Sequence, residues 1–137
     1  MISRLLGVMA LTILTIAIGC GGSGIEDPAG EGPVFRDADP RVDIDESLKG
    51  IIRVADVTSR PTAAGLLEVH LTLGNFSERP RYILVKTYFK TAAGEFLDES
   101  PEAIPVILVS GKPRDYTREA YDSDASDFLV RIIEGSP

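Results

Sequence analysis

Few side chains in this sequence are able to do acid–base or metal chemistry. His70 is the only imidazole among the 137 residues, and Cys20 is the only thiol. A zinc centre or a nucleophile–base pair needs several such groups held together. His70 also occupies a polar position of an alternating segment. The sequence therefore predicts a surface histidine and no metal site.

Clusters of carboxylates are the second candidate for chemistry. The segment 122–127 carries three aspartates, but it lacks the glycine and the distant glutamate of an EF-hand loop. We expect a turn there, in which Asp and Ser side chains bond the local backbone. Glu99 and Glu102 lie in a proline-bounded loop, which favours a solvated face, and Ser110 has no base in a recognisable pattern. The sequence predicts no catalytic residue, no cofactor and no enzyme activity.

The segment before Cys20 has the features of a secretion signal. Arg4 supplies a positive charge, and residues 5–19 form an apolar run. This run is shorter than the roughly 20 residues that a membrane-spanning helix needs. Its length is typical of the hydrophobic region of a signal peptide. We therefore expect a signal peptide over residues 1–19.

The residues directly before the cysteine, Ala17-Ile18-Gly19, resemble the lipobox of bacterial lipoproteins. The resemblance implies cleavage before Cys20, a diacylglyceryl thioether on its sulfur and acylation of the new amino terminus. Several acyl chains hold a protein stably on a bilayer, so the membrane is a predicted partner. Gly21 after the cysteine implies sorting to the outer membrane, facing the periplasm. An ordinary secretory signal and an uncleaved anchor are the alternatives.

The segment after Cys20 is rich in glycine, proline and acidic residues. Residues 21–46 carry eight acidic residues against two basic ones, whereas residues 47–137 are nearly balanced in charge. Such a composition buries too little apolar surface to offset the entropy of ordering the chain. The sequence therefore predicts a disordered acidic tether over residues 20–46 and a folded domain over residues 47–137.

The predicted domain shows strand signals at short spacing and no helical stripe. The clearest is the segment 66–74, in which leucines and a valine alternate with polar residues. Pro105 predicts an edge strand or a bulge in its segment. The pattern predicts an all-β fold, a single small antiparallel immunoglobulin-like β-sandwich of about seven strands. The strands are expected at residues 51–57, 66–74, 81–90, 95–97, 104–109, 115–120 and 127–133.

The order of motifs along these strands is similar to that of a known family. An alternating strand runs into Gly74-Asn75-Phe76-Ser77, and an apolar strand precedes Leu108-Val109-Ser110-Gly111. The last strand starts at Ala125-Ser126-Asp127-Phe128. This order, over about residues 50–134 together with Cys20, resembles the YcfL-like family of small bacterial periplasmic lipoproteins. The resemblance implies a β-sandwich after a lipobox, with no catalytic activity, cofactor or established ligand.

The outward face of the strand at residues 81–90 is the candidate interaction surface. One phase of this strand carries no charge and is assigned to the core. The alternation of side chains then places Tyr82, Leu84, Lys86 and Tyr88 outward. Two tyrosines and a leucine around a lysine form a composition that interfaces favour. The alternatives are that the tether or a loop covers this face, or that these residues are ordinary cross-strand pairs.

Charge and composition narrow the function classes. The chain has 14 Lys and Arg against 21 Asp and Glu, a formal net charge of −7, which argues against nucleic acid as a partner. We expect a lipid-anchored, non-enzymatic interaction or assembly domain of the bacterial envelope that binds another envelope protein. The alternatives are a small-ligand-binding module, which needs a deep apolar cavity, and an inhibitor or accessory subunit of an envelope enzyme.

Overall fold

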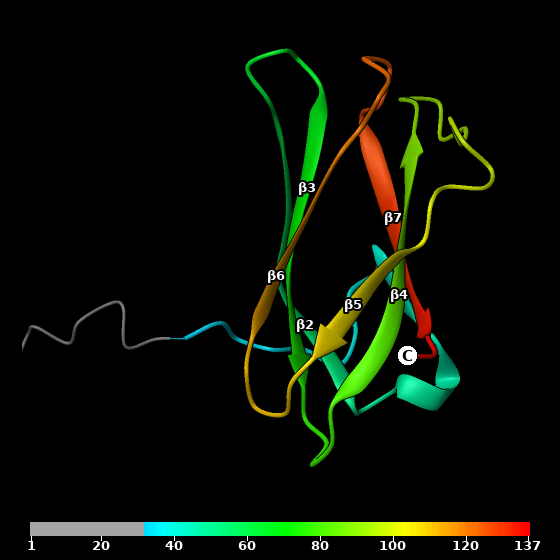
Figure 1. The fold of residues 1–137 in the computed structure, drawn as a ribbon. Coiled ribbons are helices and arrows are strands. Elements are labelled where there is room, and N and C mark those ends of the chain that lie inside the picture. Colours follow the sequence, from blue (N-terminus) through cyan, green and yellow to red (C-terminus); the bar gives the residue numbers. More distant parts are fainter. Residues whose placement is uncertain (1–31) are drawn as a thin grey trace, which may run out of the picture. The chain divides into compact units, whose positions relative to one another are not determined.

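The computed structural model describes residues 32–137, which form a β-sandwich (Figure 1). A four-stranded sheet of order β1-β7-β4-β5 packs against a three-stranded sheet of order β2-β3-β6. This confirms the predicted small β-sandwich of seven strands, but the fold is not entirely antiparallel as predicted, because β1 runs parallel to β7. The predicted signal peptide, Cys20 and the first part of the tether lie outside the described residues. The elements are β1 (Val42–Ile44), the 3-10 turn η2 (Glu46–Leu48), β2 (Ile52–Pro61), β3 (Leu67–Asn75), β4 (Arg81–Lys90), β5 (Ile104–Leu108), β6 (Arg114–Glu119) and β7 (Asp127–Glu134).

The core fills the space between the two sheets. The alternating segment predicts β3 correctly, and in the uncharged phase of β4 Ile83, Val85 and Thr87 are buried with it, while Phe89 is partly buried. Pro105 lies in β5 at the edge of the four-stranded sheet, as predicted, because an edge position does not require its missing N–H. The largest fully buried side chains are those of Phe128, Leu48, Ile52, Leu73, Ile83, Leu108 and Ile132.

Two expectations about the strands are wrong. The segment 95–97 forms only one isolated bridge, between Phe96 and Lys90. The seventh strand is instead β1, inside the predicted tether, where Val42 and Ile44 are buried and pair in parallel with β7. The boundary predicted at residue 47 is therefore too late. The acidic residues of this stretch made the strand hard to recognise in the sequence. They include its outward side chain, which faces solvent at the edge of the sheet.

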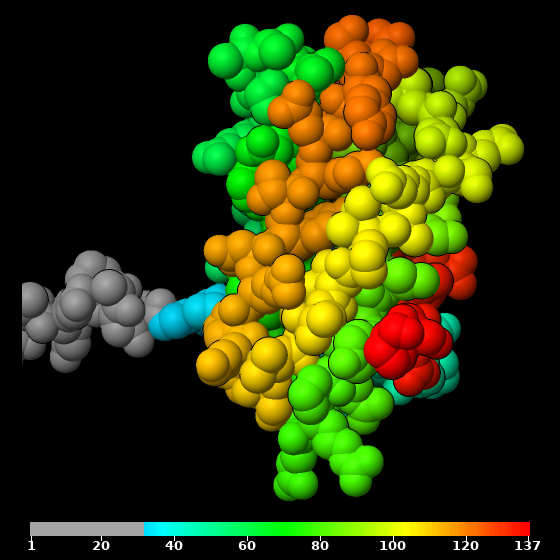
Figure 2. All heavy atoms as spheres, in the orientation of Figure 1, coloured from blue at the N-terminus to red at the C-terminus, as the bar shows by residue number. Residues whose placement is uncertain are grey.

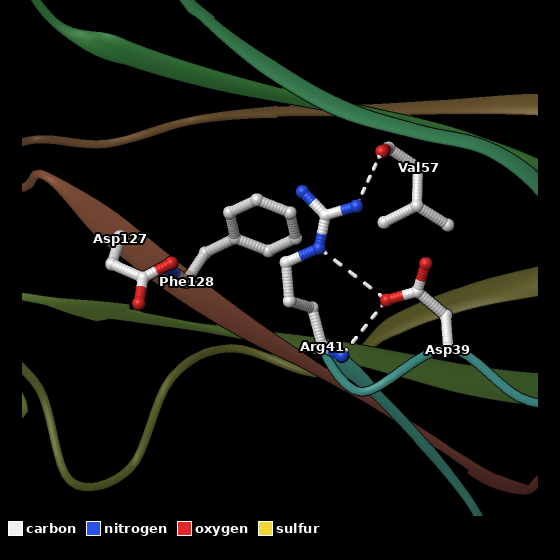
Figure 3. A network of polar contacts seen from close by, with 5 residues as sticks. All are labelled: Asp39, Arg41, Val57, Asp127 and Phe128. Carbon is white, nitrogen blue, oxygen red and sulfur yellow. Dashed lines mark hydrogen bonds and ion pairs between the residues drawn. The ribbon is translucent and has the colours of Figure 1, made fainter.

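Arg41 fixes this N-terminal segment to the sandwich (Figure 3). Its Nη2 donates to the carbonyl of Val57 at 2.7 Å, and its backbone N–H donates to Asp39 Oδ1 at 2.8 Å. The guanidinium also lies 5.3 Å from the ring centroid of Phe128. A bulge in β2 at Asp56, where φ is 53°, interrupts the ladder to β3 and leaves the Val57 carbonyl open to Arg41. The described part of the predicted tether is thus bound to β2 and β7.

Asn75 joins the turn after β3 to the end of β5. Its Nδ2 donates to the carbonyls of Arg79 at 2.8 Å and Leu108 at 2.9 Å. Its Oδ1 accepts from the N–H and the hydroxyl of Ser77, and its own carbonyl accepts from the N–H of Gly111 at 3.0 Å. Two of the segments that carried the family resemblance therefore meet at one buried amide.

Candidate functional site

The four predicted surface residues lie on the outer face of the four-stranded sheet. Tyr82, Leu84, Lys86 and Tyr88 alternate with the buried residues of β4, which lies between β7 and β5. Tyr82 is 39% exposed, and the other three are half-buried. A central strand places its outward side chains in the middle of a sheet face, so neighbours on both sides extend this surface.

Apolar side chains of the neighbouring strands enlarge the surface. Ile107 of β5 lies opposite Tyr82 and is 49% exposed. Ile133 and Leu129 of β7 lie opposite Leu84 and Tyr88. These residues could not be predicted from the sequence, because the sequence of one strand does not determine how it is aligned with strands far away in the chain. We call the outer face formed by β4, β7 and β5 the β4 face.

Two cations lie side by side in the centre of the β4 face. Lys86 pairs across the strands with Arg131, and both side chains point outward. Like charges placed directly opposite each other destabilise a sheet. Asp43 of β1 is the acidic neighbour, with its Oδ2 3.7 Å from Arg131 Nε, and both of these side chains are more than half exposed, so this ion pair adds little stability. The face therefore presents positive charge within an apolar surround.

A loop covers only one end of the β4 face. The ring of Phe96 makes an edge contact with Tyr88 at 5.6 Å between centroids, and Lys90 Nζ lies 5.4 Å from the centroid of the Phe96 ring. Cover by a loop, which the sequence left open as an alternative, therefore applies to Tyr88. At the other end, Gly135 and Ser136, which follow β7, lie next to Tyr82 and Leu84, and Tyr82 remains 39% exposed.

His70 lies on the outer face of the other sheet, half-buried between two polar side chains. Its Nε2 is 2.5 Å from Glu68 Oε1, and its Nδ1 is 3.2 Å from Thr117 Oγ1. The hydrogen bond with His70 lowers the pKa of Glu68. This order of carboxylate, imidazole and hydroxyl is that of a nucleophilic triad. Acyl transfer also needs N–H donors aimed at the developing oxyanion. The strand beneath, β3, is paired on both sides with β2 and β6. Its backbone N–H groups are therefore used in hydrogen bonds between strands and are not free to act as such donors.

The acidic segment 122–127 forms the predicted turn. Asp122 Oδ1 accepts from the N–H of Asp124, and Asp127 Oδ1 accepts from the N–H of Phe128. Within residues 32–137 no group of three His, Cys, Asp or Glu side chains has metal-binding geometry. Ser110 donates its hydroxyl to a backbone carbonyl rather than to a base. No helix in the same range is long and apolar enough to cross a membrane.

Two solved structures share the fold of this chain. The crystal structure of Campylobacter jejuni cj0090 is similar with a TM-score of 0.62 and 19% identity, over 71% of this chain and 100% of that one. A DUF1425 family member from Shewanella sp. pv-4 is similar with a TM-score of 0.56 and 19% identity, over 77% of this chain and 92% of that one. No family model and no curated protein sequence matches the chain. At this identity the likeness shows that small bacterial proteins share the sandwich.

Proposed function

We propose that this protein is a lipid-anchored, non-enzymatic interaction domain of the bacterial envelope, which binds another envelope protein through the β4 face. The pairing of Lys86 with Arg131 inside an apolar surround carries the proposal. A protein that needed only stability would avoid two like charges side by side. A partner with an acidic group flanked by apolar side chains would relieve this repulsion and cover the exposed apolar area.

The lipid anchor and the location in the cell envelope are part of the same proposal. Ala17-Ile18-Gly19-Cys20 resembles a lipobox, and the order of later motifs resembles the YcfL-like lipoproteins. The shared fold with small bacterial proteins supports this reading. A lipidated Cys20 would hold the sandwich at the periplasmic side of the outer membrane. Anchoring at a membrane raises the effective concentration of an envelope partner.

Two variants separate the parts of the proposal. Cys20→Ser should abolish labelling by radioactive fatty acid and release the protein from the membrane fraction or stall its precursor. Lys86→Glu combined with Arg131→Glu should stay labelled and folded but lose the protein that co-purifies with the wild type after cross-linking. Thr58→Glu, on the outer face of the other sheet, is the matched control and should keep that partner. Acyl labelling of Cys20→Ser would contradict the anchor, and an unchanged partner yield with the double variant would contradict the β4 face.

A further inference from the structure

A cleft of about 400 Å³ opens between the two sheets on the side where β5 and β6 form the edges. The yellow residues before β5 and the orange residues of β6 lie next to each other on this side in Figure 2. Thr87 and Phe89 of β4 form one wall, and Ala120 and Tyr121, which follow β6, form the other. This volume lies within the range of about 300–1,000 Å³ found for ligand sites. We call it the Thr87 cleft.

The backbone of Thr87 has no partner in this cleft. The carbonyl of Phe89 accepts a hydrogen bond from Leu97, which shows which edge of β4 the odd-numbered residues face. Because backbone groups alternate in direction along a strand, the N–H and C=O of Thr87 face the same edge. β5 is absent there, since its last pair joins Ile104 to Val85. Neither backbone group of Thr87 is hydrogen-bonded within residues 32–137.

Thr87 is only 4% exposed, so these unpaired groups lie in a buried position. Buried backbone groups are almost always paired, with protein, water or ligand. The side chain adds a further donor: Thr87 Oγ1 is 3.0 Å from the hydroxyl of Tyr116. Two hydroxyls bring two protons and share one bond, so one proton is left for an acceptor. Burial raises the pKa of Tyr116, which keeps this phenol protonated at neutral pH.

The mouth of the cleft is acidic. Asp98, Glu102 and Asp122 line it together with one cation, Arg118, whose Nη2 is 3.3 Å from Glu102 Oε2. Three carboxylates against one guanidinium leave a negative mouth over apolar walls. The ring of Tyr121 is 87% exposed beside it, and the Arg118 guanidinium lies 5.7 Å from the ring centroid, which shows that this ring accepts a cation at its face. Charge and shape together fit an aliphatic chain that ends in a positive group.

We propose that the Thr87 cleft binds an extended peptide segment that carries a basic side chain. One residue of the peptide would donate its N–H to the Thr87 carbonyl and accept from the Thr87 N–H, as a short added strand does. The spare hydroxyl proton would bond a second peptide carbonyl. The aliphatic part of the basic side chain would pack on the walls, and its charge would meet the carboxylates at the mouth. This site is separate from the β4 face, because Thr87 belongs to the inward phase of β4.

The test uses the full chain in detergent and the acetylated, amidated pentapeptide Ala-Val-Lys-Val-Ala. We expect a saturable shift of the Thr87 amide resonance on titration with this peptide. Replacing the peptide lysine by glutamate reverses the side-chain charge, and methylating the backbone nitrogen of that lysine removes the N–H that the Thr87 carbonyl would accept. Each change should weaken binding about tenfold or more. An unshifted Thr87 amide at about 10 mM peptide, or equal binding of the glutamate peptide, would overturn the proposal.

Paired variants test the mouth of the cleft. Glu102→Gln with Asp122→Asn should weaken binding of the lysine peptide about tenfold, because both acceptors lose charge but keep a hydrogen-bonding oxygen. Glu99→Gln with Asp124→Asn removes the same charge from neighbouring positions that do not line the cleft, and should leave binding unchanged. Equal weakening by both pairs would contradict a defined site. Lys86→Glu with Arg131→Glu should not alter peptide binding, so the cleft and the β4 face fail or survive separately.

Discussion

At the scale of single residues, Asn75 shows how this sandwich is held together. It is 2% exposed and satisfies four groups through its side-chain amide, at the carbonyls of Arg79 and Leu108 and at the N–H and hydroxyl of Ser77. Removing such a side chain leaves buried donors and acceptors without partners, which costs more than the net value of the bonds themselves.

Asn75→Ala should therefore lower the free energy of unfolding by about 2–4 kcal/mol, measured by urea denaturation. Asn75→Asp should destabilise at least as much, because a carboxylate cannot donate to the two carbonyls. Ser77→Ala removes only one side of the network and should cost about 1 kcal/mol. A loss for Asn75→Ala no larger than that for Ser77→Ala would show that the amide is not the junction described here.

Glu68 and His70 give the protein a pH-dependent contact. The pKa of Glu68 is lowered, chiefly by its hydrogen bond with His70 and less by Arg60. A carboxyl whose pKa is lower in the folded state stabilises the fold above its unfolded pKa, and this stabilisation is lost as the pH falls through the folded pKa.

His70→Ala should raise the pKa of Glu68 toward its ordinary value of 4.5, followed by the NMR titration of the Glu68 carboxyl carbon. The stability difference between wild type and variant should shrink as the pH falls below the ordinary carboxyl range. Arg60→Ala is the control and should raise the pKa of Glu68 by less. A Glu68 titration that is the same with and without His70 would contradict the assigned contact.

At the scale of elements, β1 shows what the sequence could and could not reveal. The longer strands carry their alternation openly, so β3 and β4 could be predicted with their inward phases. β1 has only three residues, two of them apolar and placed among aspartates, and its partner β7 lies at the other end of the chain. No short stretch of the sequence contains both strands of the pair that buries Val42 and Ile44.

The site divides in the same way. The outward residues of β4 follow from alternation alone, which is why Tyr82 and Lys86 were predictable. Their neighbours Arg131 and Ile107 depend on the register of β7 and β5. The Thr87 cleft exists because β5 begins too late in the chain to pair with Thr87. The loop between β4 and β5 has a mixed composition, so its sequence does not show at which residue β5 begins. Local pattern thus gives one strand of a surface, and only tertiary pairing gives the rest.

A chain that starts at residue 47 should be far less stable than one that starts at residue 32. It loses the burial of Val42 and Ile44, which together amount to about 3–6 kcal/mol, and it exposes the edge of β7. This is a large share of the roughly 5–15 kcal/mol that stabilises a domain. Thermal unfolding of the two chains measures the difference, and Ile44→Ala in the longer chain should cost about 2–4 kcal/mol. Equal unfolding temperatures would restore the later boundary.

At the scale of the whole molecule, the two outer faces of the sandwich differ in character. The three-stranded sheet presents threonines, His70 and charged residues, a face suited to water. The β4 face presents the exposed apolar surface of Tyr82 and Ile107 beside two cations that lie opposite each other. A sandwich tethered to a membrane would keep one of these faces available to a partner and the other in solvent. This contrast is the reason why we propose that the β4 face, and not the opposite face, binds a partner.

Photo-crosslinking in intact cells tests this assignment most directly. A benzophenone amino acid replaces Tyr82 on the β4 face in one version of the full chain and Thr58 on the opposite face in another, so that Lys86 and Arg131 are both kept. We predict one discrete protein adduct from position 82, lost when Arg131→Glu is added, and no adduct from position 58. Equal adducts from both positions, or none from position 82 in a folded and membrane-bound protein, would contradict the account.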